Sequence, residues 1–116
     1  MKYKLEKSGS ILILELLGSL EGGWETFQLK DEVVKQVQEG ERQFLIDLRN
    51  ASFVNSTGIG VMVALQITVS TAEGEIKFCS ISDRIRRSFQ ATGAGIWESM
   101  QIYSDREEAI PTFSRS

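Results

Sequence analysis

The stretch FVNSTGIG, residues 53–60, decides the fold because it joins an apolar strand to a long apolar helix. Residues 44–48 (FLIDL) are short and rich in strand formers, whereas residues 61–69 (VMVALQITV) are apolar for long enough to be helical. Asn55 and Ser56 are residue types that favour helix N-caps, and the glycines of the stretch let the backbone turn tightly. The pattern therefore predicts a strand, a tight turn and a helix, with hydroxyl groups at the start of the helix.

The same turn is suited to negative charge. The unpaired N–H groups and the dipole at a helix N-terminus both favour an anion, so we interpret Ser56 as a candidate regulated, phosphorylatable residue. A serine or threonine at this position is also commonly a simple helix cap. The residues of the turn alone leave both interpretations open.

The length and composition indicate one globular domain that is not built to bind nucleic acid. A chain of 116 residues can bury one core but is short for two, and 41% hydrophobic with 25% charged residues is ordinary for a globular protein. A net charge of -3 argues against binding a phosphate backbone, which normally needs a basic face. We interpret the one basic cluster, Arg84, Arg86 and Arg87, as the solvated face of a short helix.

Several signals of membranes and catalysis are missing from the sequence. No segment reaches the roughly 18 apolar residues of a membrane span, and the first residues lack the apolar core of a signal peptide. We therefore expect a cytoplasmic protein without membrane insertion. The chain has no histidine, a single cysteine (Cys79) and no Gly-rich phosphate loop. We expect no enzyme activity, no metal site and no cofactor.

Periodicity and turn residues predict the other elements. Two strands over residues 3–6 and 10–17 form an expected hairpin, and Gly18 ends the second strand. The remaining predictions are helices over residues 24–38, 58–71 and 82–92, the last capped by Ser82, strands over residues 75–80 and 101–103, and a frayed terminus that includes Pro111. Strands that alternate with helices imply a mixed sheet covered by helices on at least one face.

The predicted helix over residues 58–71 carries two apolar stripes instead of one. At roughly 100° per residue, the first stripe consists of Val61, Met62, Leu65 and Val69, and the second of Ile59, Val63 and Ile67. A single sheet covers one stripe well. The second stripe is therefore expected against another element of the chain or against a partner.

The pattern as a whole resembles the STAS domain, which is named for sulfate transporters and anti-sigma-factor antagonists, and it looks most like the small free-standing bacterial antagonists. The resemblance rests on residues 17–21 (LGSLE), on residues 44–60, and on residues 79–83 (CSISD) leading into Ile85, Phe89, Thr92 and Gly93. It implies a single α/β domain over residues 1–116, with a mixed central sheet of about five strands and about four helices packed on it.

The resemblance also implies a function. In this family the serine after an Asp, in a segment Asp-Ser-Ser/Thr-Gly-Leu/Ile-Gly, is phosphorylated by a cognate anti-sigma serine kinase, and the matching position here is Ser56. The unphosphorylated protein would bind the kinase and free the sigma factor. Phosphorylation would break that complex, and a metal-dependent serine phosphatase would restore it.

Two positions depart from the family pattern. Asn55 stands where antagonists generally have Asp, and Glu21 stands where a Gly-x-Leu/Ile-Asp segment usually ends in Asp. A second interpretation is therefore an interaction module that is not phosphorylated, either a scaffold in a sensory assembly or an accessory subunit of a transporter ATPase, in which Ser56 is only a cap. A third is a small-ligand sensor with a pocket beside Ser56.

Residues near this turn are predicted to bind the partner. Trp24 is either an anchor at the edge of the core or an interface aromatic, and we favour the core. The predicted binding surface comprises Glu21, Trp24, Asn55, Ser56, Thr57, Gly58, Ile59, Val63 and Ile67. No catalytic residue is predicted, and the sequence makes no prediction of the oligomeric state.

Overall fold

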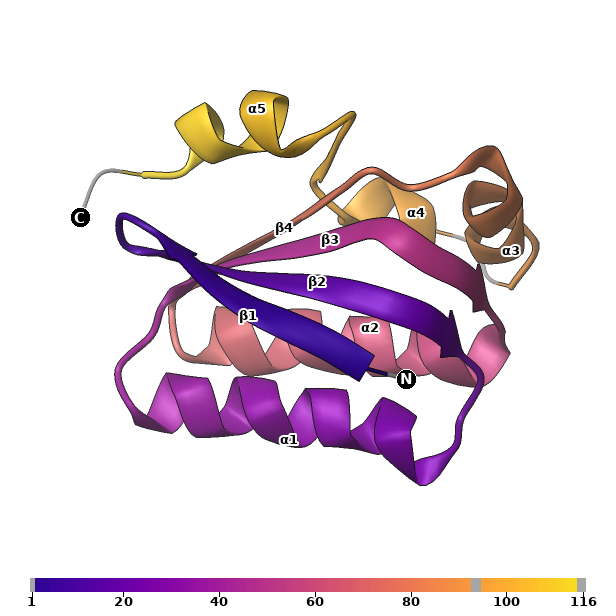
Figure 1. Cartoon of the computed structure of the whole chain (residues 1–116), viewed down its shortest axis with the longest axis horizontal. Coiled ribbons are helices and arrows are strands. Elements are labelled where there is room, and N and C mark those ends of the chain that lie inside the picture. The colour runs from indigo at the N-terminus through magenta and orange to yellow at the C-terminus, as the bar shows by residue number, and fades with distance from the viewer. Residues whose placement is uncertain (1, 93–94, 115–116) are drawn as a thin grey trace.

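The structure, a computed structural model, describes residues 2–92 and 95–114. Five strands form one sheet in the spatial order β1-β2-β3-β4-β5 (Figure 1). Strand β2 pairs antiparallel with β1 and parallel with β3, and β4 and β5 continue the sheet in parallel. The strands are β1 Lys2–Ser8, β2 Ile11–Leu20, β3 Gln43–Val54, β4 Glu75–Cys79 and β5 Ile102–Tyr103. The predicted mixed sheet is confirmed.

Helices cover both faces of this sheet. Two long helices lie side by side on one face, and the helical segment over residues 106–112 lies on the other (Figure 1). The helices over residues 83–92 and 96–99 pack against the same core as the two long helices. The helices are α1 Trp24–Gln38, α2 Ser56–Thr71, α3 Asp83–Thr92, α4 Ile96–Ser99 and α5 Arg106–Ala109, and α5 continues into the 3-10 helix η1 Ile110–Thr112. The predicted bounds of α1 are confirmed, and Ser82 caps α3 as predicted, because its Oγ accepts from the N–H of Ile85 at 3.2 Å.

Two cores form because side chains alternate along each strand. In β2, Leu12, Leu14 and Leu16 face the helices α1 and α2 and belong to the larger core. The alternate residues Ile11 and Ile13 face the other way. They form a smaller core with Leu45, Cys79, Ala109 and Phe113, which lies under the C-terminal segment.

Three strands are longer than the sequence predicts: β1, predicted over residues 3–6, and the two strands β2 and β3 that lead to the next loops. Gly18 does not end β2, because its positive φ of 88° is accommodated beside a register shift between Gly18 and Ser19. Strand β3 likewise runs past Leu48, and its extension pairs with the extension of β2, ending at Leu20 opposite Val54. Pairing between these two extensions therefore brings the ends of β2 and β3 to the same place.

The predicted frayed terminus is wrong for residues 111–114. Pro111 lies in η1, and Phe113 is buried against the sheet. The amino group of the buried Lys77 donates to the carbonyl and hydroxyl oxygens of Thr112, both at 2.8 Å. Residues 115 and 116 lie outside the described part. A buried cation that needs oxygen partners thus holds the C-terminal segment on the sheet.

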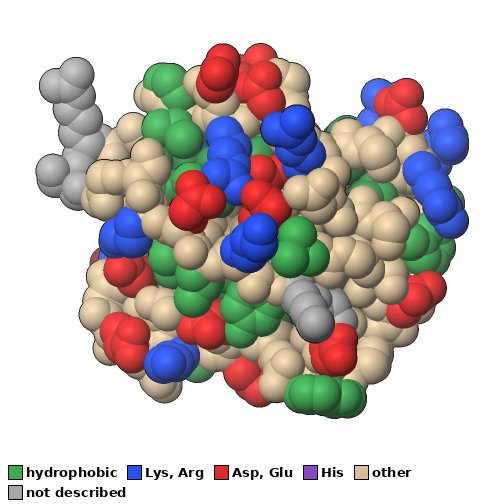
Figure 2. All heavy atoms as spheres, in the orientation of Figure 1, with side chains coloured by type: hydrophobic (Ala, Val, Ile, Leu, Met, Phe, Trp, Pro, Cys, Tyr) green, Lys and Arg blue, Asp and Glu red, His purple; other side chains and the backbone are tan. Residues whose placement is uncertain are grey.

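Arg106 provides the second attachment of this segment. Its guanidinium donates to Asp47 at 2.6 Å, to Glu15 at 2.7 Å and to Glu6 at 3.0 Å, which are carboxylates of three adjacent strands. Figure 2 shows acidic and basic side chains interleaved between α5 and the strands. Partial burial opposes the charge of Arg106, but the hydrogen bonds to Asp47 and Glu6 outweigh it and raise the pKa of Arg106.

Candidate functional site

The candidate site lies where β2 and β3 end together. We call residues 55–58 the Ser56 loop and residues 21–23 the Glu21 loop. Carboxyl ends of parallel strands meet at one edge of a sheet, so the segments that follow them become neighbours. The backbone N–H of Asn55 donates to the carbonyl of Leu20 at 3.1 Å. The sequence-predicted residues at Glu21 and Ser56 are therefore brought to one edge.

Asn55 links the two loops. Its side-chain oxygen caps α2 by accepting from the N–H of Gly58 at 3.0 Å, and its side-chain N–H donates to the carbonyl of Glu21 at 3.0 Å. An aspartate could make the first bond but not the second, because an ionised carboxylate only accepts. The departure from the family's Asp therefore has a structural consequence, since the amide of Asn55 ties the Glu21 loop to the Ser56 loop.

Ser56 is the first residue of α2 and is exposed to solvent. The interpretation of Ser56 as the helix cap is wrong, because Asn55 fills that role. Within residues 2–92 and 95–114, no hydrogen bond restrains the Ser56 hydroxyl. The hydroxyl is thus free to meet a second protein, at the positive end of a helix whose first turn contains no acidic residue.

Glycines allow the two loops to touch. A Cβ on Gly58 would overlap the carbonyl oxygen of Leu20 and would lie 2.8 Å from the Cβ of Leu20. A Cβ on Gly22, whose φ is +96°, would lie 2.9 Å from the Cγ2 atom of Thr57. Thr57 itself is exposed. Gly58 and Gly22 therefore set how closely the start of α2 approaches β2 and the Glu21 loop.

The Glu21 loop presents an acid and an aromatic ring to solvent. The carboxylate of Glu21 is exposed and accepts from the Ser19 hydroxyl at 2.9 Å. Trp24, the first residue of α1, is 70% exposed, so its placement at the edge of the core is wrong. A hollow of about 350 Å³ is lined by Ser19, Glu21, Gly23, Trp24, Glu25 and Thr26.

The second apolar stripe of α2 is divided between the core and the surface. Ile59 is only 1% exposed and packs in the larger core, so it is not available to a partner. Val63 is half-buried, and Ile67 is 62% exposed. These two line an open hollow of about 440 Å³ together with Gln66, Ser70, Thr71 and Ser99. Only the part of the stripe farther from Ser56 therefore forms surface.

Sequence reasoning missed two aromatic residues near this edge. Phe27 is 47% exposed and lies one helical turn after Trp24, a spacing that was visible in the sequence. Phe53 carries the guanidinium of Arg84 over its ring, with 5.0 Å between the guanidinium carbon and the ring centroid. That contact joins β3 to α3, and no local sequence signal indicates it.

The remaining reactive groups lie away from the two loops. Burial raises the pKa of the Cys79 thiol to about 12, and the nearby charge of Asp47 acts in the same direction. Partial burial and a hydrogen bond to Glu32 raise the pKa of Tyr3 to about 12. In the described part of the chain, no three His, Cys, Asp or Glu side chains are grouped as a metal site would need. None of the helices described is long and apolar enough to cross a membrane.

Comparison with known protein families identifies this arrangement. Residues 2–109 match the STAS domain family. This chain is a member of the STAS family, and the expected fold is confirmed.

Two relatives by sequence are antagonists by name. BtrV of Bordetella bronchiseptica, which carries the provisional name of an anti-sigma factor antagonist, is 26% identical over 97% of this chain and 95% of its own length. The anti-sigma-B factor antagonist of Staphylococcus aureus is 32% identical over 66 residues, which is 57% of this chain and 61% of the relative.

The fold is also that of a solved antagonist. The anti-sigma factor antagonist SpoIIAA in its unphosphorylated form matches with a TM-score of 0.73 and 20% identity, over 91% of both chains. SpoIIAA of Bacillus in its phosphorylated form matches with a TM-score of 0.70 and 22% identity, over 95% of this chain and 97% of the other. At this identity the likeness concerns the fold.

Proposed function

We propose that this chain is an anti-sigma-factor antagonist of a partner-switching pathway. It binds an anti-sigma serine kinase while Ser56 is unmodified, and phosphorylation of Ser56 by that kinase releases it. A metal-dependent serine phosphatase returns it to the binding form. The observation that carries the proposal is the exposed Ser56 hydroxyl at the start of α2, which makes no hydrogen bond in the described part of the chain while Asn55 performs the capping.

The electrostatics of α2 suit such a switch. A phosphate adds roughly -1.5 to -2 charges, and the free N-terminus of a helix stabilises negative charge. No charged residue occurs between Arg49 and Glu73, so the helix itself offers no carboxylate to repel the group. In a protein interface the same phosphate would lose its hydration and would face a surface without partners for its charge. Phosphorylation would therefore weaken binding without unfolding the domain.

The named relatives support this proposal. BtrV and the Staphylococcus aureus protein are both named as antagonists, and SpoIIAA has been solved with and without its phosphate in a fold like this one. The proposed partner surface consists of the Ser56 loop, Glu21, Trp24 and the exposed positions Val63 and Ile67. Ile59 supports the surface from the core.

A mass measurement tests the proposal. The protein is mixed with magnesium, ATP and its candidate anti-sigma serine kinase, and its intact mass is compared with that of Ser56→Ala and Thr57→Ala. We expect one phosphate on the wild type and on Thr57→Ala, and none on Ser56→Ala. A pull-down without ATP should capture the kinase with the wild type. Phosphate that persists in Ser56→Ala would contradict the proposed site.

The alternative is an interaction module without phosphorylation, such as a scaffold of a sensory assembly or an accessory subunit of a transporter ATPase. Asn55 favours it, because the position beside Ser56 lacks the carboxylate that antagonists generally have and its amide is used to hold the Glu21 loop. A complex that forms in the pull-down, together with no phosphate on any residue after incubation with ATP, would favour this alternative.

A further inference from the structure

Helix α3 carries three arginines within four residues, namely Arg84, Arg86 and Arg87. The guanidinium of Arg86 pairs with the carboxylate of Asp83 at 3.1 Å. In the described part of the chain, no carboxylate lies within ion-pair distance of Arg84 or Arg87, which are both exposed. We call Arg84 and Arg87 the arginine ridge. Because they are three residues apart on a helix, they lie on one face.

The guanidinium of Arg84 is held in place. It lies over the ring of Phe53, with 5.0 Å between the guanidinium carbon and the ring centroid, and Phe53 is half-buried at the end of β3. Stacking of this kind occupies the face of the guanidinium and leaves the N–H donors at its edge free. Those donors match a carboxylate in a two-bond geometry. Arg84 is thus already oriented before any partner arrives.

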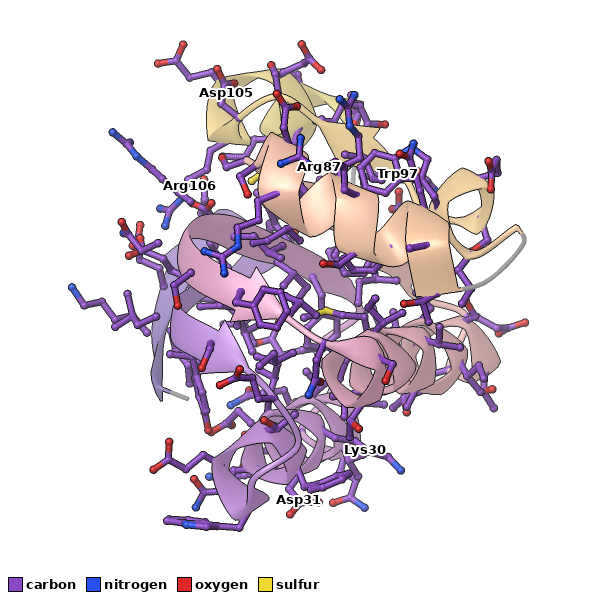
Figure 3. All side chains as sticks on the ribbon, turned by 90° about the vertical axis from the view of Figure 1, so that its right-hand side faces the viewer. Lys30, Asp31, Arg87, Trp97, Asp105 and Arg106 are labelled. Carbon is purple, nitrogen blue, oxygen red and sulfur yellow. The ribbon has the colours of Figure 1, made fainter. Side chains whose placement is uncertain are left out.

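The surface is uncharged on one side of the arginine ridge, toward the end of β3 and α2, whereas Asp83 and Arg86 of α3 carry exposed charges. Residues 50–72, which include the end of β3, the Ser56 loop and the whole of α2, contain no charged side chain. Figure 2 shows several basic side chains, with an acidic one among them, at the edge of the molecule where Figure 1 places α3. In Figure 3, which faces this edge, Arg87 lies on α3, whereas Lys30 and Asp31 lie well away on α1. The ridge is a cationic border beside an uncharged surface.

We propose that the arginine ridge is a docking surface for a protein partner that presents a cluster of carboxylates. The number of cations decides against nucleic acid, because tracking a phosphate backbone needs an extended basic face and this chain has a net charge of -3. A short carboxylate cluster needs only the two guanidinium groups. This docking is separate from the chemistry of Ser56 and does not require phosphorylation.

Exposed charges mainly affect the rate at which a partner associates. Charge pairs at the rim of an interface raise the association rate and make it dependent on salt, while they add little to the lifetime of the complex. The ridge therefore selects acidic surfaces and orients them toward the uncharged side of the domain. Binding through the ridge should weaken as the ionic strength rises.

Nuclear magnetic resonance of the isotope-labelled protein with a capped deca-glutamate peptide as the probe tests this proposal. At low salt we expect amide shifts concentrated in residues 83–92 and ring shifts at Phe53, with smaller changes at about 150 mM salt. The double variant Arg84→Gln with Arg87→Gln should bind the peptide about fivefold more weakly. Lys30→Gln on α1 is the matched control and should bind as the wild type does. A deca-glutamine peptide should cause no shifts.

Two results would overturn the proposal. Equal peptide affinity in the wild type and the double variant would show that the ridge does not select carboxylates. The second result concerns other probes: binding is also measured to vesicles containing phosphatidylglycerol and, separately, to a single-stranded oligonucleotide. Tighter binding of either probe than of the peptide, lost in the double variant, would assign the ridge to phosphate-bearing surfaces instead. The variants change only exposed side chains, so circular dichroism should confirm an intact fold.

Discussion

Replacing glycine by alanine should have opposite effects on stability at two positions of α2, Gly58 and Gly60. Gly58 lies against β2, where an added Cβ would overlap the carbonyl oxygen of Leu20 and would lie 2.8 Å from its Cβ and 3.0 Å from the Cγ1 atom of Val54. Gly60 is exposed, and an added Cβ would have nothing within 4 Å. Alanine at each position therefore separates the cost of the close approach from the general benefit of replacing glycine in a helix.

The magnitudes follow from these distances. Carbon atoms in contact prefer about 3.5–4.0 Å, so Gly58→Ala is at least about 0.5 Å short on each carbon and also meets backbone that cannot rotate away. Overpacking of this kind costs about 1–3 kcal/mol, and we expect the upper part of that range. Both variants gain about 0.8–1 kcal/mol from helix propensity. Gly60→Ala should therefore be more stable than the wild type, and Gly58→Ala should be less stable by about 2 kcal/mol.

Urea unfolding measures the difference between the two variants. The two variants differ by about 3 kcal/mol, so with a slope of about 1–3 kcal/mol per molar urea their midpoints should differ by roughly 1–3 M. Gly60→Ala is the matched control, because it changes the same residue type in the same helix. Equal stability of the two variants would refute the close approach of α2 to β2 on which the geometry of the Ser56 loop depends.

Three further predictions concern other parts of the domain. Asn55→Ala should lower the free energy of unfolding by about 1 kcal/mol through loss of the cap. Asn55→Asp should keep the cap but lose the hydrogen bond to the carbonyl of Glu21, and hydrogen exchange at residues 21–23 should increase. Unchanged exchange would contradict the hydrogen bond between the two loops. Because the pKa of Tyr3 is raised to about 12 in the folded protein, its contribution to stability is complete below the unfolded pKa near 10 and is lost as the pH rises toward 12. Tyr3→Phe should flatten this alkaline decrease in chemical unfolding experiments, and an unchanged pH profile would argue against the bond to Glu32. The buried Cys79 thiol, with its pKa raised to about 12, should react with a thiol reagent near pH 8 only as fast as the protein unfolds, and rapid labelling of the native protein would contradict its burial.

The fold was predictable where periodicity is strong. The helix over residues 24–38 has apolar residues at helical spacing and forms with the predicted bounds. The ends of β2 and β3 gave no such signal, because residues 49–53 are largely polar or exposed. They become part of β3 only by pairing with the end of β2. The C-terminal segment was missed for a similar reason, since its position depends on Lys77 and Arg106, whose partners are distant in the sequence.

The candidate site was predictable in position but not in its internal contacts. The strand-to-helix turn located Ser56 at the start of α2, as the structure shows. The dual role of Asn55 depends on the backbone of Glu21, which lies 34 residues away in the sequence. Helical periodicity placed Ile59 on the stripe expected against another element or a partner, and the structure buries it in the larger core. Packing orientation of this kind is not contained in a one-dimensional pattern.

The central claim is that phosphate on Ser56 switches partner binding while the domain stays folded. The most direct measurement uses protein with phosphoserine incorporated at position 56 and compares its affinity for the candidate anti-sigma serine kinase with that of the unmodified protein, alongside the melting temperature of each. We predict an affinity at least about 100-fold lower, equivalent to about 2.7 kcal/mol, and melting temperatures within a few degrees of each other. Equal affinities, or loss of binding accompanied by unfolding, would contradict the claim.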